Sequence, residues 1–256
     1  MENALLIGLS RQMVLSRELD IVANNIANID TTGYKSDNAA FSDFLTSGAS
    51  EQQFNGADRR VNFVQDRATW IDMSQGAIQR TGNPLDVAIS GLGYLAVQGP
   101  RGQRYTRNGA LAINNTGQLV TSEGYQVQGD AGPITFQPTD HDVSISANGI
   151  ITVREGAGTA DVVRGKLQLV SFDDPRVLQK DGSSTFMPPN GVTANPAPPS
   201  VTVVQGAIEK SNVNAVAEMA HMIRITRSYS DIANILQQEN DQRRNALQQL
   251  AQLPTS

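Results

Sequence analysis

Few residues of this 256-residue chain could carry out chemistry. Cysteine is absent, which excludes disulfides, thiolate nucleophiles, iron–sulfur clusters and cysteine-based zinc sites. The two histidines, His141 and His221, lie far apart in the chain, which argues against a metal site or acid–base catalysis. His221 is expected to pack at an interface and His141 to lie in a turn. The sequence therefore predicts no catalytic residue, no metal and no cofactor.

Two short motifs resemble catalytic or cofactor sites. The run Gly91-Leu92-Gly93-Tyr94-Leu95-Ala96 fits the loose dinucleotide pattern G-x-G-x-x-A. That mechanism needs a helix to start next, whereas Tyr94–Val97 has strand-like composition. We therefore predict a tight turn. Asp173 and Asp174 stand before Pro175, and this pair also predicts a turn rather than two catalytic carboxylates.

Charge and hydropathy exclude further classes of protein. The net charge is −5, and the longest basic clusters are Arg59-Arg60 and Arg243-Arg244, which argues against nucleic-acid binding. No apolar run approaches the roughly 18 residues that a membrane span needs, so no membrane insertion is expected. The N-terminus lacks the features of a cleaved secretory signal. The protein is expected to be cytoplasmic, or to leave the cell by a route that cleaves nothing.

Both ends of the chain have helical apolar patterns. Residues 4–29 and 213–253 lack proline, and their apolar residues alternate spacings of three and four, which predicts one apolar face on each helix. The N-terminal face comprises Leu15, Leu19, Val22, Ile26 and Ile29, and the C-terminal face comprises Met222, Ile225, Tyr229, Ile232 and Leu236. Gly33 suits a left-handed position after the first helix. The two long helices are expected to pair as a coiled coil, with each other or with other copies.

An asparagine-rich stretch ends the first predicted helix. Asn24, Asn25 and Asn28 fall among apolar residues, although asparagine is a poor helix former. One interpretation is a fraying helix end whose amides satisfy free backbone carbonyls. The other is that Asn24 and Asn28, one turn apart, fix the register by hydrogen bonds between helices, as buried asparagine does in coiled coils, while Ala23 and Ala27 allow the helices to approach closely. The residues alone leave both interpretations open.

The middle of the chain is typical of β-structure. Short β-type runs alternate with turns such as Asn115-Thr116-Gly117 and Asn148-Gly149, and no helical pattern intervenes. The fold class is therefore α+β, with terminal helices around a central antiparallel all-β domain. The expected division is a helical coiled-coil domain (1–30 and 211–256), an extended connector (31–80 and 201–210) and a β-rich outer domain (81–200).

Four blocks of sequence, in order along the chain, resemble the flagellar rod and hook proteins, the axial protein family. The blocks are Ala23–Lys35; Gln75-Gly76 with Thr81–Ile89 and Gly91–Val97; Arg104–Gly109 with Gly117–Val120; and Gln205–Asn214 with Glu218-Met219. The length and the Glu2-Asn3 start look most like proximal-rod members of that family. A distal-rod or hook-type subunit is the alternative. Less expected alternatives are a wall-associated hydrolase or a β-domain adhesin.

The resemblance implies a structural subunit and not an enzyme. Such proteins are exported unfolded and uncleaved by the flagellar type III apparatus, and they polymerise helically into the rod within the periplasmic space. The implied partners are copies of the chain, other rod proteins and the export apparatus. The terminal helices would form the inner layer of the tube. The expected subunit-interface residues are Leu15, Leu19, Val22, Asn24, Asn25, Ile26, Asn28, Gly33, Met222, Ile225, Tyr229, Ile232 and Leu236.

Overall fold

The computed structural model describes residues 2–47, 60–156, 158, 160–182 and 184–251. The chain divides into two compact units. The helical unit comprises Met1–Ile26, Asp37–Trp70 and Asn214–Ser256, and the β unit comprises Ala27–Ser36 and Ile71–Val213. The α+β class is confirmed. The three-part division into helical, connector and outer domains stays a prediction, and its residues 48–59 and 252–256 lie outside the described residues.

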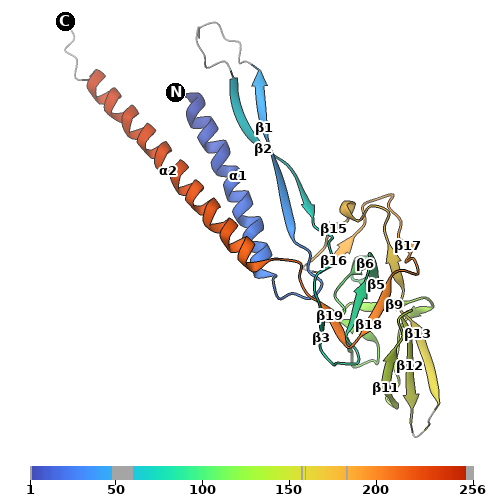
Figure 1. The fold of residues 1–256 in the computed structure, drawn as a ribbon. Coiled ribbons are helices and arrows are strands. Elements are labelled where there is room, and N and C mark those ends of the chain that lie inside the picture. Colours follow the sequence, from blue (N-terminus) through green and yellow to red (C-terminus); the bar gives the residue numbers. More distant parts are fainter. Residues whose placement is uncertain (1, 48–59, 157, 159, 183, 252–256) are drawn as a thin grey trace, which may run out of the picture. The chain divides into compact units, whose positions relative to one another are not determined.

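Two long helices and one pair of strands form the helical unit. Helix α1 spans Glu2–Ala27 and helix α2 spans Ala215–Ala251. They lie side by side and run antiparallel (Figure 1). Asn214 caps α2, because its side-chain oxygen accepts from the amides of Val216 and Ala217. Both predicted helices are confirmed, while their coiled-coil geometry stays a prediction.

Strands β1 (Asp37–Ser47) and β2 (Arg60–Ile71) pair in a two-stranded sheet, in a region for which the sequence predicted only an extended connector. Neither helix, over the described residues, combines the length and apolarity that crossing a membrane requires.

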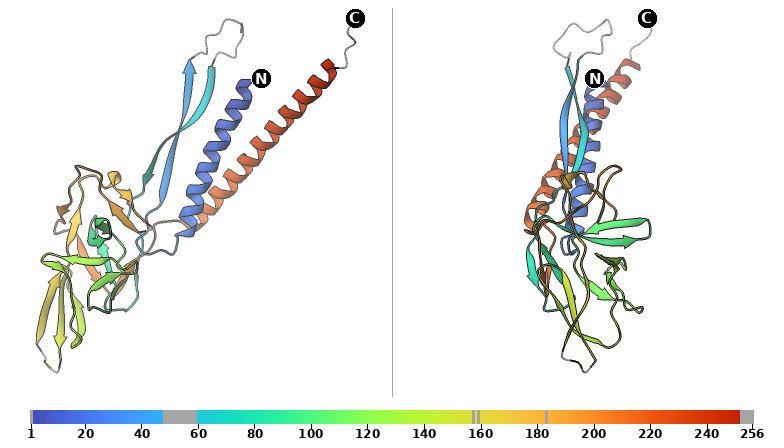
Figure 2. Two further views of the ribbon diagram at one scale, coloured as in Figure 1. Left: turned by 180° about the vertical axis from the view of Figure 1, so that it is seen from behind. Right: turned by 90° about the vertical axis from the view of Figure 1, so that its right-hand side faces the viewer.

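The β unit is built of antiparallel ladders throughout its described residues. Its largest sheet has ten strands: β5 (Tyr94–Gly99), β6 (Gly102–Thr106), β7 (Leu111–Ile113), β8 (Leu119–Thr121), β9 (Gln126–Gly129), β10 (Gly132–Pro133), β14 (Leu169–Ser171), β15 (Gln179–Lys180), β16 (Thr185–Met187) and β17 (Asn195–Pro196). A three-stranded sheet holds β11 (Asp140–Ile145), β12 (Ile150–Glu155) and β13 (Asp161–Lys166). Two strand pairs complete it: β4 (Val87–Ser90) with β18 (Thr202–Gln205), and β3 (Ile78–Arg80) with β19 (Ala207–Glu209). The predicted antiparallel β region is confirmed, and both views of Figure 2 show it.

Two apolar clusters fill the β unit. The larger cluster contains buried residues from early and late parts of the unit's sequence, among them Val87, Leu95, Ile151 and Val203. The smaller is aromatic: the Tyr94 ring meets those of Phe172 and Phe186 edge-on. Strands β18 and β19, within the predicted connector 201–210, thus contribute to the body of the β unit.

One minor prediction is wrong. His141, expected in a turn, lies in strand β11. The register of β11 shifts between His141 and Ser144, and Asp142 between them has a positive φ of 51°. A bulge therefore replaces the turn that the flanking aspartates suggested.

Candidate functional site

The predicted apolar faces meet between α1 and α2 of the same chain. Leu15, Val22 and Ile225 are buried there. Leu19, Ile26, Met222 and Ile232 pack around them. Leu236 faces Gly8, where an added Cβ would lie 2.7 Å from the leucine Cδ2. Tyr229 is the most exposed of these side chains. Most of the apolar residues expected between subunits thus make contacts within one chain, and their role between subunits stays a prediction.

Polar contacts accompany the apolar contact between the helices. The Nε2 of His221 lies 2.8 Å from the Glu18 Oε1, so this histidine does join two helices. Asn25 is buried, and its amide nitrogen donates to the Glu218 carboxylate at 3.3 Å. The same amide group donates to the Asp37 carbonyl and accepts from the Asp37 N–H, both at 2.9 Å. Asn25 therefore fixes the end of α1 against both α2 and the start of β1.

The three asparagines differ in their surroundings. Asn24 is exposed on α1, whereas Asn28 lies beyond the helix end and accepts from the Thr31 hydroxyl at 3.1 Å. The sequence suggested the register role for Asn24 and Asn28, whereas the interhelical hydrogen bond described here belongs to Asn25. It satisfies backbone groups near the helix end, and it links two helices.

A short segment after α1 lies buried in the β unit. Gly33 has φ +70°, as expected for a left-handed position. A Cβ there would lie 2.5 Å from the backbone of Arg107 and Asn108. Tyr34 is buried, and the Lys180 ammonium lies 4.0 Å from its ring centroid. The backbone of the segment bonds on both sides, because Gly33 donates to the Glu209 carbonyl and Tyr34 accepts from Asn212.

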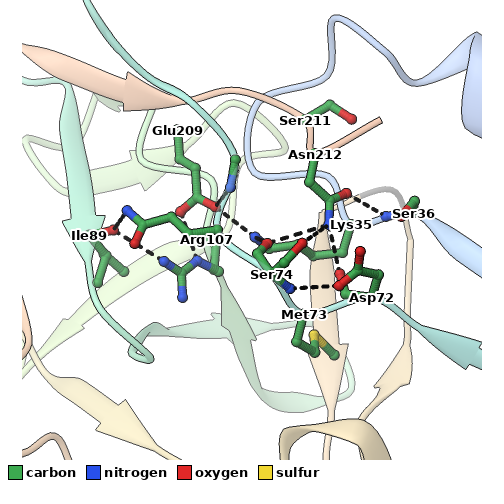
Figure 3. A network of polar contacts seen from close by, with 12 residues as sticks. Lys35, Ser36, Asp72, Met73, Ser74, Ile89, Arg107, Glu209, Ser211 and Asn212 are labelled. Atoms are coloured by element: carbon green, nitrogen blue, oxygen red, sulfur yellow. Dashed lines mark hydrogen bonds and ion pairs between the residues drawn. The ribbon is translucent and has the colours of Figure 1, made fainter. Parts of the chain in front are cut away.

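Behind this segment lies a buried ion cluster, which we define as Lys35, Arg107 and Glu209 (Figure 3). The Lys35 ammonium lies 2.6 Å from one Glu209 oxygen, and the Arg107 Nε lies 2.8 Å from the other. All three side chains are at most 1% exposed. Two cations thus share one carboxylate away from water. The Gly76 amide also donates to Glu209, at 2.9 Å.

Arg107 uses its remaining donors on a turn. Its guanidinium donates to the carbonyls of Ile89, Gly91 and Gly93 at 2.9–3.1 Å. Gly91 has φ +99°, and strand β5 follows directly. The tight turn predicted for the G-x-G motif is therefore confirmed. In the second motif, Asp174 caps a single turn of 3-10 helix at Pro175–Val177, so that predicted turn is confirmed as well.

Burial shapes the electrostatics of the cluster. Desolvation lowers the pKa of Lys35 from its ordinary value, and the nearby Glu209 carboxylate opposes this effect. Burial raises the pKa of the neighbouring Tyr94 to about 12. Among the residues that the structure describes, no three His, Asp or Glu side chains gather as a metal site would require.

Asn212 ties three chain segments together beside the cluster (Figure 3). Its oxygen accepts from the Ser36 amide at 2.8 Å, and its nitrogen donates to the Asp72 carbonyl at 2.8 Å. The chain crosses between the two units close to each of these three residues. The crossings lie directly after Ser36, shortly before Asp72 and shortly after Asn212. We assigned no role to Lys35, Arg107 or Glu209 from the sequence, and Asn212 was expected only as one of several residues that could start the C-terminal helix. The available signal was that each lies in one of the family-like blocks.

Comparison with known proteins covers nearly the whole chain. Three family models match in order: "Flagella basal body rod protein" at residues 5–35, "Flagellar hook protein FlgE/F/G D1 domain" at 88–153, and "Flagellar basal body rod FlgEFG protein C-terminal" at 204–249. The flagellar basal-body rod protein FlgF of Caulobacter vibrioides is 38% identical over 99% of this chain and 100% of its own length.

Two further relatives carry different names. FlgF of Mesorhizobium japonicum is 32% identical, with 93% of each chain covered. FlgG of Agrobacterium fabrum is 35% identical over 89% of this chain and 91% of its own. Both are called flagellar basal-body rod proteins. The chain belongs to the flagellar basal-body rod protein family, a family of structural proteins and not of enzymes.

Proposed function

We propose that this chain is a structural subunit of the proximal part of the bacterial flagellar rod, which transmits torque and encloses the export channel. The observation that carries the proposal is the match to a FlgF protein from end to end, which includes both terminal helices and the β unit. A FlgG-type, distal-rod role is the second candidate, because a FlgG relative is nearly as similar, at 35% identity.

The helical unit is the part that we assign to the polymer. A coiled-coil pairing of α1 and α2 would give a stiff rod-like element from both chain ends, and the buried contact through Leu15, Val22 and Ile225 supports it. The expected interface residues Asn24, Asn28 and Tyr229 remain candidates for contacts with neighbouring subunits, whereas Gly33 is buried within the β unit against the Arg107 and Asn108 backbone. The β unit, with its own two apolar clusters, would form the outer part of each subunit.

Partners and location follow from the same proposal. The chain would bind copies of itself and other rod proteins, and the flagellar type III apparatus would export it without a cleaved signal. It would reside in the basal-body rod, in the periplasmic space. The absence of cysteine is compatible with this route, because an unfolded chain in transit could form no disulfide.

The test is genetic replacement combined with isolation of basal bodies. A strain without the gene should be non-motile, and the full chain should restore both motility and a complete rod. A variant without residues 2–26 should fail to restore motility while its β unit keeps its near-ultraviolet tyrosine signal, since that unit begins at Ala27. Electron microscopy of the deletion strain separates the two candidates. A rod absent above the membrane ring favours the proximal role, and a rod truncated further out favours the distal one. Normal motility of the deletion strain would refute both.

A further inference from the structure

Three steps in the described chain join an asparagine to a glycine, namely Asn108-Gly109, Asn148-Gly149 and Asn190-Gly191. Asparagine is chemically labile. A following glycine has no Cβ, so nothing hinders its backbone nitrogen from attacking the side-chain carbon of the asparagine. Because the three steps share this local chemistry, the folded structure must decide which of them can react.

The first step is held on both sides. Asn108 is buried, its oxygen accepts from the Ala110 amide at 3.1 Å, and its nitrogen donates to the Ser122 hydroxyl at 2.9 Å. The carbonyl of Gly109 accepts from the Val87 amide at 2.9 Å. The asparagine side chain therefore cannot turn toward the glycine nitrogen unless this part of the β unit opens.

The second step has a free side chain but a held nucleophile. Asn148 is exposed, whereas Gly149 is buried with φ +79°. The Gly149 amide donates to the Ser146 carbonyl at 2.9 Å, and its own carbonyl accepts from the Leu167 amide at 2.8 Å. Attack on Asn148 would break the first of these hydrogen bonds and strain the second.

The third step is held on neither side. Asn190 and Gly191 are the exposed central residues of a turn, which the Val192 amide closes by donating to the Pro189 carbonyl at 3.1 Å. Gly191 has φ +90°, and nothing lies within 4 Å of a Cβ added there. Neither the Asn190 side chain nor the Gly191 amide forms a hydrogen bond with any residue that the structure describes. The nucleophile and the carbon that it would attack are both free to move.

We propose that Asn190 is a modification site, at which the folded chain deamidates spontaneously with water as the co-reactant. The Gly191 nitrogen gives its proton to a solvent base and forms a bond to Cγ of Asn190, while the Cγ–Nδ2 bond breaks and ammonia leaves. Water then opens the resulting succinimide ring. Opening at Cγ gives aspartate, and opening at the main-chain carbonyl gives isoaspartate. No group is oxidised or reduced.

The products change one turn of the β unit. Each adds a negative charge at an exposed position, and isoaspartate also inserts one carbon into the main chain. The turn is anchored on both sides, because Phe186 before it is buried in the aromatic cluster and Val192 after it packs against that cluster. The modification is therefore confined to the turn, and the modified fraction rises with the age of the chain. This inference does not depend on the proposed function.

Timed incubation of the full-length protein tests the site. The chain is held in mildly alkaline buffer, and peptide mapping by mass spectrometry follows the conversion of amide to acid at the three asparagines. In the folded chain, Asn190 should react at least tenfold faster than Asn148 or Asn108. In urea the three rates should agree within a few fold, which shows that the fold and not the sequence sets the difference. Labelling with an isoaspartyl methyltransferase should detect isoaspartate at position 190.

Two variants complete the test. Gly191→Ala places a methyl group beside the attacking nitrogen and should slow the reaction of Asn190 at least tenfold in urea, where strain in the folded turn plays no part. Asn190→Asp supplies the charge without isoaspartate and should keep the near-ultraviolet tyrosine signal of the β unit. The proposal is overturned if Asn148 or Asn108 reacts as fast as Asn190 in the folded chain. It is also overturned if position 190 yields aspartate without isoaspartate, or stays unmodified while the unfolded chain reacts.

Discussion

The two units of the chain each bring its N-terminal and C-terminal parts together, by opposite chemical means. In the helical unit, Leu15 and Val22 meet Ile225 through apolar contact. In the β unit, Lys35 meets Glu209 through a buried charge. An apolar contact weakens gradually as side chains are trimmed. A buried charge that loses its partner is left with its full desolvation penalty. We therefore expect a single substitution in the helical contact to lower the free energy of unfolding moderately, and a single substitution in the ion cluster to lower it strongly.

The largest effect is expected at the carboxylate of the ion cluster. Glu209→Ala leaves two buried cations without a counter-charge, which should lower the free energy of unfolding of the β unit by about 3–5 kcal/mol. Urea unfolding followed by near-ultraviolet tyrosine dichroism measures it, since four of the five tyrosines lie in that unit. The control is Glu155→Gln, which removes a half-exposed partner of Arg164 and should change stability by less than about 1 kcal/mol. Equal effects would mean that the cluster is not truly desolvated.

The helical unit offers a matched pair of isoleucines two positions apart. Ile225→Ala opens a cavity in the buried contact and should destabilise the helices by about 2–4 kcal/mol, measured by far-ultraviolet dichroism. Ile223→Ala trims an exposed side chain and should change folding by less than about 0.5 kcal/mol. If the two variants unfold alike, the contact seen between α1 and α2 does not persist in solution.

Gly33 tests whether the segment after α1 belongs to the β unit. Gly33→Ala forces a Cβ against the Arg107 backbone at a positive φ, and should destabilise the β unit by about 2–3 kcal/mol. Gly82 has a similar φ of +76°, and nothing lies within 4 Å of a Cβ added there. Gly82→Ala therefore measures only the cost of placing alanine at a positive φ, which is about 1 kcal/mol of folding stability. Thermal unfolding of both variants measures the difference. Identical losses would place Gly33 outside any tight contact.

A smaller effect concerns alkaline stability. The pKa of Tyr94 is about 12 in the folded chain, against about 10 when unfolded. Between these values the unfolded state loses its proton first, so stability falls as pH rises from 10 to 12, by roughly 3 kcal/mol in all. Tyr94→Phe should remove that part of the decline in urea titrations at pH 9, 10 and 11. The stability of Tyr94→Phe at pH 7 serves as the reference, so that the pH-independent effect of the lost hydroxyl is subtracted.

The sequence predicted what depends on local spacing. The apolar spacing from Leu15 to Ile26 can be seen within one short stretch of sequence. It predicted both the helix and the face of the helix that is buried. The short β-type runs around Leu95 and Leu119, each bounded by turn residues, likewise predicted strands. Strands β1 and β2 were missed, because residues 36–80 are polar and show no clear period. The sequence also left open whether the two apolar faces pack against each other in one chain or against other copies. Periodicity shows that a face is buried, but it does not show which partner covers it.

The ion cluster could not have been predicted in this way. Lys35 and Glu209 are separated by 174 positions, and their contact depends on how the ladders of the β unit bring distant segments together. Neither residue differs in type from partly exposed residues elsewhere in the chain, such as Lys166 and Glu155. Arg107 was equally inconspicuous, although the glycine motif that it contacts was recognised.

The turn at Gly91–Gly93 has the glycine spacing of a nucleotide-binding loop, but it binds a cation through carbonyl groups instead of an anion through amide groups. In a phosphate loop, amide hydrogens converge on an anion. Here the carbonyl oxygens of Ile89, Gly91 and Gly93 converge on a guanidinium that the protein carries itself. The carbonyl groups of this turn are already occupied by Arg107. A ligand could bind them only if Arg107 left both the turn and its pairing with Glu209. In this chain, the contacts of the buried Arg107 therefore argue against a cofactor role for the glycine motif.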